Sequence, residues 1–203
     1  MKRKILSIIL ACFMLTTLLA GCGKNQAQEE TQNDFPLLSG KYNAEIVVKD
    51  YGTIKLELDA DTAPITVTNF VNLAKDGFYN GLTFHRIIEG FMIQGGDPLG
   101  NGTGGSDTNI KGEFELNGIK NDISHVRGVI SMARSEDYDS ASSQFFIVQA
   151  DSTYLDKQYA AFGHVTEGME VVDAICAKMT ELGFSDSIPA ENQPVIESIT
   201  IIE

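Results

Sequence analysis

The chain has 203 residues, 43% hydrophobic and 21% charged, which is enough for one well-packed core with additional segments. Its formal net charge of −13 argues against a nucleic-acid-binding protein, because nucleic acids select basic surfaces. Of Cys12, Cys22 and Cys176, only the last lies in the body of the chain, which excludes an internal disulfide there.

The first 21 residues have the pattern of a bacterial lipoprotein signal peptide. A basic start at residues 2–4 precedes an apolar run over residues 5–20, which is short for a membrane-spanning helix and carries hydroxyl side chains. The run ends in Leu-Ala-Gly-Cys at residues 19–22, which resembles a lipobox. This resemblance implies cleavage before Cys22, a lipid on that residue and an extracytoplasmic protein anchored to a bacterial membrane. The alternative is a soluble secreted protein with an incidental cysteine.

Residues 22–40, which begin with the cysteine expected to carry the lipid, are predicted to be a disordered tether. The segment is rich in Gln, Asn and Glu and has almost no large apolar side chain before Phe35, so it cannot bury enough surface to offset its ordering entropy. As a flexible coil it would span roughly 20–25 Å. The folded domain, expected over residues 41–203, would therefore lie close to the membrane surface.

The folded domain is predicted to begin with two strands and a helix. Residues 44–49 and 53–59 read as strands, and the second alternates cleanly with period two. A helix over residues 64–75 starts at Pro64, which the first turn of a helix tolerates. The apolar stripe expected to face the core consists of Val67, Phe70, Val71 and Ala74.

Residues 84–97 are predicted to form a hairpin around a Glu-Gly turn. Arg86 and Gln94 stand in its two runs, where a buried strand would prefer apolar side chains. Phe91 and Met92 are adjacent, and neighbours on a strand point to opposite faces, so one of them can line a surface pocket. From these residues alone, an ordinary hairpin with an incidental arginine fits the pattern equally well.

Residues 100–105 formally match the nucleotide-binding pattern G-x-G-x-x-G. A dinucleotide site needs a strand before this pattern and a helix N-terminus after it. Here Asp97-Pro98 precedes the pattern, residues 106–109 have no helical stripe, and no Lys-Ser/Thr pair completes a phosphate-binding loop. We therefore predict a tight glycine-rich loop that shapes a surface.

The rest of the chain alternates short strands with loops and ends in a helix and a strand. The predicted elements are a strand at 128–134, a polar loop at 135–143, a strand at 144–149, a turn at 154–159, a strand at 160–165, a helix at about 169–179 and a closing strand at 195–202. Many short antiparallel strands with only two helices predict a mainly β barrel or sandwich, because closure removes exposed edges. Cys176 falls on the apolar face of the second helix, which favours a core residue over a nucleophile.

The sequence lacks the residue patterns that most kinds of enzymatic catalysis require. His85, His125 and His164 have no zinc-ligand spacing, so no metal or other cofactor is predicted. No Gly-x-Ser-x-Gly motif of a serine hydrolase occurs. Glu89 and Asp97 could form the carboxylate pair of a glycosidase, but two solvated carboxylates in turns are the more common explanation of such residues.

What remains is a set of polar residues on strands among apolar residues that can be exposed. The set consists of Arg86, Gln94 and Gln144 with Phe91, Met92, Phe146 and Leu155. Such a set suits a short apolar peptide segment held by fixed hydrogen bonds.

Five motifs together resemble the cyclophilin family. They are Phe84-His85-Arg86-Ile87-Ile88, Gly90-Phe91-Met92-Ile93-Gln94-Gly95-Gly96-Asp97, Gly102-Thr103-Gly104-Gly105, Ser131-Met132-Ala133 and Ser143-Gln144-Phe145-Phe146-Ile147. They occur in the family's order, and the match extends from about Tyr42 to Glu203. The resemblance implies a closed eight-stranded antiparallel barrel capped by two helices, and peptidyl-prolyl cis-trans isomerase activity without a cofactor.

The resemblance also implies roles for individual residues. Arg86 would be the catalytic guanidinium. The remaining predicted substrate-binding residues are Phe91, Met92, Phe146 and Leu155 in the proline pocket, Gln94 and Gln144 on the substrate backbone, Ala133 and Arg134 beside the residue before proline, and His85, Tyr154 and Tyr159. Tyr154 stands where many eukaryotic members have Trp, which predicts weak inhibition by cyclosporin.

The partners implied are proline-containing segments of unfolded or secreted proteins, which the enzyme would help to fold outside the cytoplasm. The membrane would be reached only through the lipid on Cys22, and a monomer is expected. The alternative is a chaperone or scaffold that binds proline segments and in which catalysis is incidental.

Overall fold

The computed structural model describes residues 36–202, so the predicted signal peptide and most of the predicted tether lie outside it. The strands are β1 (Lys41–Val48), β2 (Gly52–Asp59), β3 (Thr83–Ile88), β4 (Met92–Asp97), β5 (Val129–Met132), β6 (Phe145–Val148), β7 (Ala161–Glu167), β8 (Asp186–Ser187) and β9 (Ile196–Ile202). The helices are α1 (Pro64–Lys75) and α2 (Met169–Glu181), with short 3-10 helices η1 (Glu115–Asn117), η2 (Thr153–Leu155) and η3 (Ala190–Asn192).

The alternation predicted for β2 is confirmed. Ile54, Leu56 and Leu58 are at most 1% exposed, whereas the residues between them are only partly buried. Successive side chains of a strand point to opposite faces, so one face of β2 enters the core and the other meets solvent. This one-sided burial fixes the register of the strand.

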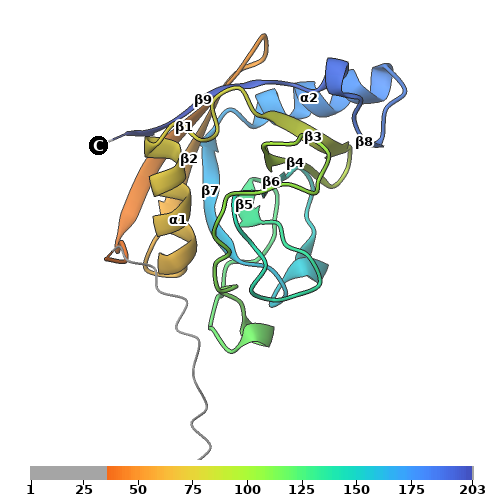
Figure 1. Ribbon diagram of the computed structural model, residues 1–203. Coiled ribbons are helices and arrows are strands. Elements are labelled where there is room, and N and C mark those ends of the chain that lie inside the picture. Colours follow the sequence, from red (N-terminus) through yellow and green to blue (C-terminus); the bar gives the residue numbers. More distant parts are fainter. Residues whose placement is uncertain (1–35, 203) are drawn as a thin grey trace, which may run out of the picture. The chain divides into compact units, whose positions relative to one another are not determined.

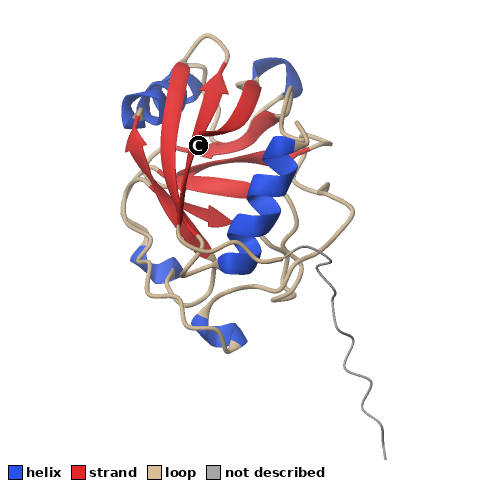
Figure 2. Cartoon of the chain, turned by 90° about the vertical axis from the view of Figure 1, so that its left-hand side faces the viewer, coloured by secondary structure: helices blue, strands red, loops and turns tan. Residues whose placement is uncertain are grey.

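All strands belong to one antiparallel sheet in the order β8-β3-β4-β6-β5-β7-β2-β1-β9. The sheet curls until its ends meet: Phe84 N donates to Pro194 O at 2.9 Å, and Ile196 N donates to Leu82 O at 2.7 Å. Figure 2 shows the strands wrapped around each other with α1 in front of them. The predicted mainly β barrel with two helices is confirmed, but the sheet has nine strands where eight were expected, and the two-residue strand β8 was not predicted.

The two helices pack on different parts of the barrel. α1 contacts β2 and β9, while α2 contacts β2 and β3 (Figure 1). The predicted stripe of α1 is buried, and Cys176 of α2 is fully buried. Burial raises the pKa of the Cys176 thiol to about 12, so the thiol stays protonated at neutral pH. The predicted core role of Cys176 is confirmed.

Strands β5 and β6 are shorter than predicted at the end where they meet. Ala133 and Arg134 lie beyond β5, and Gln144 lies before β6. Ala133 N still donates to Gln144 O at 3.0 Å, so the two chains remain side by side after the regular strands end. These three residues line the surface cavities described below. Within residues 36–202, no helix is both long and apolar enough to cross a bilayer.

Candidate active site

A cavity of about 130 Å³ opens on the barrel surface beside β3, β4 and β6. Its apolar lining consists of Phe91, Met92, Ala133, Phe146 and Leu155, and its polar lining of Arg86, Gln94, Arg134 and Tyr159. Every one of these residues belongs to the predicted site, although they come from four separate stretches of the chain. The fold therefore assembles an apolar floor bordered by two guanidinium groups.

Strand register places the central residues of this cavity in a row. Arg86 on β3 lies opposite Gln94 on β4, and Gln94 lies opposite Phe146 on β6. Opposite residues in an antiparallel pair share a face of the sheet, so all three side chains point to the same side. Phe91 also lines the cavity beside Met92, because it stands in the turn before β4 where strict alternation does not apply. Strand alternation predicts that one of this pair can line a pocket, and the structure brings both side chains to the cavity.

Arg86 is held at the edge of the cavity by a carboxylate. Its Nε lies 2.5 Å from Asp186 Oδ1, and its side chain is 39% exposed. Within the described part of the chain, neither Nη atom of Arg86 has a hydrogen-bond acceptor. The outer part of the guanidinium is thus available to a group bound in the cavity.

Two glutamines connect the cavity to the glycine-rich loop. Gln94 Nε2 donates to Gln144 Oε1 at 2.9 Å, and Gln144 Nε2 donates to Gly104 O at 2.7 Å. Both glutamines also line a neighbouring cavity of about 200 Å³, with a mostly polar wall that includes Arg134. A peptide lying across the two cavities would therefore meet amide groups with fixed orientations.

The glycine-rich loop at residues 100–105 is organised around a carboxylate of the protein itself. Asp97 accepts hydrogen bonds from Leu99 N at 2.8 Å, Asn101 N at 3.1 Å and Gly102 N at 2.6 Å. A Cβ atom at Gly104 would collide with Asp97 Oδ1, which explains the glycine there. The amides that would hold a phosphate in a nucleotide site are already occupied, in agreement with the prediction of a surface-shaping loop.

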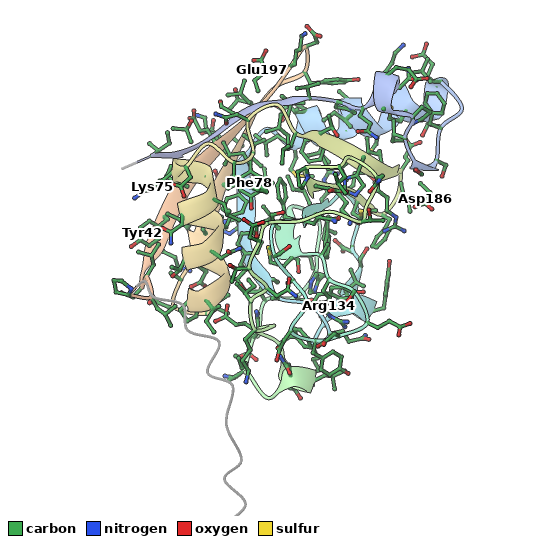
Figure 3. The ribbon with its side chains drawn as sticks, viewed as in Figure 1. Tyr42, Lys75, Phe78, Arg134, Asp186 and Glu197 are labelled. Carbon is green, nitrogen blue, oxygen red and sulfur yellow. The ribbon has the colours of Figure 1, made fainter. Side chains whose placement is uncertain are left out.

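Arg134 is fixed on the opposite side of the cavity. Its Nε and Nη2 donate to Gln158 O at 3.1 and 2.9 Å, and its Nη1 donates to Ser135 O at 2.8 Å. The guanidinium also lies 4.7 Å from the centre of the Tyr159 ring, within the range of a cation–π contact. Figure 3 shows Arg134 in the lower part of the barrel and Asp186 at its right-hand edge. Unlike Arg86, Arg134 has its donors engaged by the backbone.

Three predicted site residues lie outside the lining of the cavity beside β3. His85 is buried, and its imidazole lies against Gly102 of the glycine-rich loop. Tyr154 is 64% exposed and its ring centre is 5.9 Å from that of Phe91, which places it at the rim. Gln144 belongs to the neighbouring cavity instead. The substrate contacts expected of these residues remain predictions, and for His85 the burial argues against a direct contact.

Comparison with known proteins identifies the family. The family model described as "Cyclophilin type peptidyl-prolyl cis-trans isomerase/CLD" matches residues 44–201. This chain is a cyclophilin. The enzyme class implied by its motifs, peptidyl-prolyl cis-trans isomerase, is thereby confirmed.

Curated relatives and solved structures of this family resemble the chain over most of its length. Peptidyl-prolyl cis-trans isomerase A of Dickeya dadantii is 45% identical over 162 residues, which cover 75% of this chain and 80% of the relative. Peptidyl-prolyl cis-trans isomerase B of Bacillus subtilis is 46% identical over 124 residues, or 61% and 83% of the two chains. A crystal structure of a Cryptosporidium parvum cyclophilin, obtained in the presence of the dipeptide Ala-Pro, has a TM-score of 0.70 and 30% identity; 79% of this chain and 99% of that chain are covered.

Beneath the cavity of this cyclophilin, a row of hydrogen-bonded side chains joins the buried His125 and Ser131 to the half-buried Asp156, and the sequence did not reveal it. His125 Nδ1 is 2.9 Å from Asp156 Oδ1, and His125 Nε2 is 3.1 Å from Ser131 Oγ. The imidazole stacks under Phe146, with ring centres 6.1 Å apart and planes 17° apart. Although the three residue types match a hydrolytic triad, Ser131 is fully buried and no substrate can reach it. The hydrogen-bonded side chains of Asp156, His125 and Ser131 instead support the aromatic floor of the cavity.

These residues were missed because nothing in their spacing joins them. His125 and Asp156 are 31 positions apart, and each is an ordinary loop residue when viewed alone. The sequence likewise predicts only a turn carboxylate at Asp97 and gives no role to Asp186. Among residues 36–202, no group of three or more His, Cys, Asp or Glu side chains is arranged to hold a metal ion.

The two buried histidines predict a loss of stability in mildly acidic solution. Burial lowers the pKa of His85 and of His125, and for His125 it outweighs the opposing effect of the hydrogen bond that the imidazole donates to Asp156. Below about pH 6.5, the unfolded chain therefore takes up protons that the folded chain does not bind. The free energy of unfolding should fall as the pH drops through this value and level off below the folded pKa values, which urea unfolding at a series of pH values will measure.

A variant of His85 separates this effect from general acid sensitivity. Neither ring nitrogen of His85 has a hydrogen-bond partner within residues 36–202, so His85→Leu removes a titrating group without breaking a hydrogen bond. In this variant, the free energy of unfolding should fall less steeply as the pH drops, by up to about 1.4 kcal/mol per pH unit. His164→Gln, at an exposed histidine, serves as the control and should leave the profile unchanged. If the free energy of unfolding of His85→Leu depended on pH as it does in the wild type, His85 would not be a cause of the acid sensitivity.

Proposed function

We propose that this cyclophilin works outside the cytoplasm, anchored to a bacterial membrane by a lipid on Cys22, and rotates X–Pro bonds in unfolded or secreted polypeptides. The observation that carries the catalytic part is the cavity with an apolar floor and the free Nη groups of Arg86 at its edge. The location rests on the signal-peptide pattern and lipobox at residues 1–22, which lie outside the described residues. Proline-containing polypeptides are the proposed partners of a monomeric enzyme, and nucleic acid is not one of them.

The chemical problem is rotation about a partial double bond. Amide resonance gives this rotation a barrier of about 18–20 kcal/mol, and an X–Pro bond isomerises unaided in roughly tens to hundreds of seconds. At the top of the barrier the amide is twisted and its resonance is lost. The prolyl nitrogen then regains its lone pair, becomes pyramidal and can accept a hydrogen bond.

Arg86 is placed to stabilise that twisted state. A guanidinium hydrogen bond to the prolyl nitrogen is stronger in the twisted amide than in either planar form, and this difference is what accelerates the reaction. Arginine suits the role because it remains charged at neutral pH and offers several donors on one rigid plane. The Nη groups that face no acceptor within residues 36–202 are the donors that we assign to this contact.

The other cavity residues are assigned to binding and orientation. Phe91, Met92, Phe146 and Leu155 provide an apolar surface for the proline ring. Gln94 and Gln144 are oriented by their mutual hydrogen bond and by the carbonyl of Gly104, so they can hold the substrate backbone while the X–Pro bond turns. Arg134 leaves the peptide mainly its aliphatic stem, since its donors are engaged by carbonyls.

The proposed activity is tested by the refolding of a protein whose slow step is prolyl isomerisation. The chain without residues 1–21 should accelerate this phase in proportion to its concentration, and a proline-containing tetrapeptide should compete with the refolding protein. An unaltered slow phase at enzyme concentrations that saturate the refolding protein would exclude the activity.

The anchor makes a separate prediction at Cys22. In a bacterial cell that processes lipoproteins, the wild-type chain should sediment with membranes and carry a labelled fatty acid. Cys22→Ser removes the thiol that would accept the lipid, so the variant should lose the label and leave the membrane fraction. Cys176→Ser is the control, because that thiol is buried in the core and should not affect labelling. Equal labelling of wild type and Cys22→Ser would refute the anchor without affecting the isomerase assignment.

A further inference from the structure

Strand β8 brings Asp186 to Arg86. The barrel closes through hydrogen bonds between residues 81–84 and the start of β9, but the next part of β3 pairs with β8 instead. Ile87 is the register partner of Asp186, and Ile188 N donates to His85 O at 2.9 Å. The side chain of Ile188 is buried, so the short strand is fastened by backbone and core together. Figure 3 shows Asp186 at the edge of the barrel on the side of the β3–β4 hairpin.

The contact between Asp186 and Arg86 involves one particular nitrogen. Asp186 Oδ1 lies 2.5 Å from Nε, which is the inner donor of the guanidinium. A carboxylate on the Nη atoms would compete with a substrate for the same donors, whereas a carboxylate on Nε leaves both Nη groups free. A guanidinium is a rigid plane, so fixing Nε also limits the directions in which the Nη groups can point.

The ion pair between Asp186 and Arg86 is not expected to contribute much to the stability of the fold. The side chain of Asp186 is 60% exposed, and exposed ion pairs contribute little to the free energy of folding. Asp186 also adopts a φ of 79°, a left-handed conformation that non-glycine residues rarely occupy, although aspartate tolerates it better than most. Unusual backbone conformations of this kind concentrate at functional sites.

We propose that Asp186 is a positioning residue for catalysis: its carboxylate holds Nε of Arg86 so that the Nη groups are aimed into the cavity before the substrate arrives. This inference rests on the proposed function of Arg86. A free arginine side chain would sample many rotamers and would have to be ordered during the reaction, whereas a held one is already oriented. The expected consequence is an effect on turnover that exceeds any effect on substrate binding.

The test compares Asp186→Ala and Asp186→Asn in the chain from residue 22 onward. Asp186→Ala should lower kcat about tenfold, as is common when a group that orients a catalytic residue is lost, with KM changed less than about twofold. Asp186→Asn keeps an oxygen that can accept from Nε and should retain more of the activity. Asp173→Asn is the matched control, because Asp173 pairs with Arg127 at a place that does not line the cavity.

Two further measurements show whether Asp186 acts through Arg86. In an Arg86→Lys background, Asp186→Ala should cause little additional loss, because residues that act as a unit are not additive. The Nε–H signal of Arg86 in a nitrogen-15 NMR spectrum, assigned as the one missing in Arg86→Lys, should move in both Asp186 variants and stay in place in Asp173→Asn. This signal reports the contact independently of turnover.

Several results would overturn the inference. They are an unchanged or increased kcat in Asp186→Ala, an equal loss in the Arg86→Lys background, and an Nε–H signal that does not respond to Asp186. If the wild-type enzyme is active, any one of these results would exclude the positioning role of Asp186 and leave the proposed function intact. A wild-type enzyme without turnover would instead contradict the proposed function, and this inference with it.

Discussion

Arg86→Ala is expected to lower kcat/KM for prolyl isomerisation by about 10²–10³-fold, the range seen when one donor to a transition-state charge is removed. The variant loses the Nη donors at the cavity edge, which have no protein acceptor within residues 36–202. Its free energy of unfolding should change little, because the ion pair that it breaks is exposed. Protease-coupled or refolding assays, run beside urea unfolding, measure both quantities.

Arg127→Ala is the matched control for Arg86→Ala. Arg127 also forms an exposed ion pair with an aspartate, Asp173, but it does not line the cavity. This control should retain wild-type turnover while losing the same charge. Binding of a proline-containing tetrapeptide should survive in Arg86→Ala, because the apolar floor remains. Wild-type-like turnover in Arg86→Ala would exclude the proposed mechanism.

Asp97→Ala is expected to reduce the free energy of unfolding by about 3 kcal/mol or more, since hydrogen bonds to a charged group contribute about 1.5–3 kcal/mol each. Asp97 is 1% exposed and organises the glycine-rich loop through backbone amides. Without it, the amides of Leu99 and Gly102 lose their acceptor. Gln144, which is bonded to this loop, should lose its orientation, and isomerase activity should fall as well. Urea unfolding and the isomerase assay test the two effects.

The pH dependence of Asp97 supplies an independent check. Burial alone would raise the pKa of this carboxyl, but hydrogen bonds from the loop amides outweigh burial and lower it. Its stabilising contribution is therefore present above the unfolded pKa of about 3.9 and is lost as the pH falls through the folded value. Asp97→Ala should weaken the acid-induced loss of stability. Asp107→Ala, at an exposed aspartate just beyond the same loop, should behave like wild type; an equal destabilisation by both changes would contradict the role of Asp97.

The parts of the fold that were predictable are those with a strong local pattern. The alternation of β2 and the stripe of α1 each follow from burial on one side, so period alone identifies them. The cavity was predictable in a different way, because the motifs of residues 84–97 and 143–147 are specific to one family. Residues alone left Arg86 undecided between an incidental strand residue and a catalytic group.

The parts that were not predictable depend on contacts between distant residues. A two-residue strand such as β8 has no periodicity, and only the unfilled edge of β3 explains it. The chain from Asp156 through His125 to Ser131 joins two loops and a strand, and a carboxylate such as Asp97 looks like any solvated turn residue until its donors are known. Sequence periodicity reports burial but does not report hydrogen-bond partners.

Strand β8 also has a consequence for how copies of the chain would behave next to one another under the proposed lipid anchor. Proteins held on a membrane by a lipid are confined to two dimensions, where collisions between exposed strand edges become frequent. β8 covers the part of β3 that β9 leaves unpaired, and a strand of only two residues offers little edge for another chain to extend. Its residues are Asp186 and Ser187, so the outermost edge is polar and one of its two side chains is an acid. The same short strand that holds Asp186 against Arg86 therefore discourages crowded molecules from assembling through their sheets.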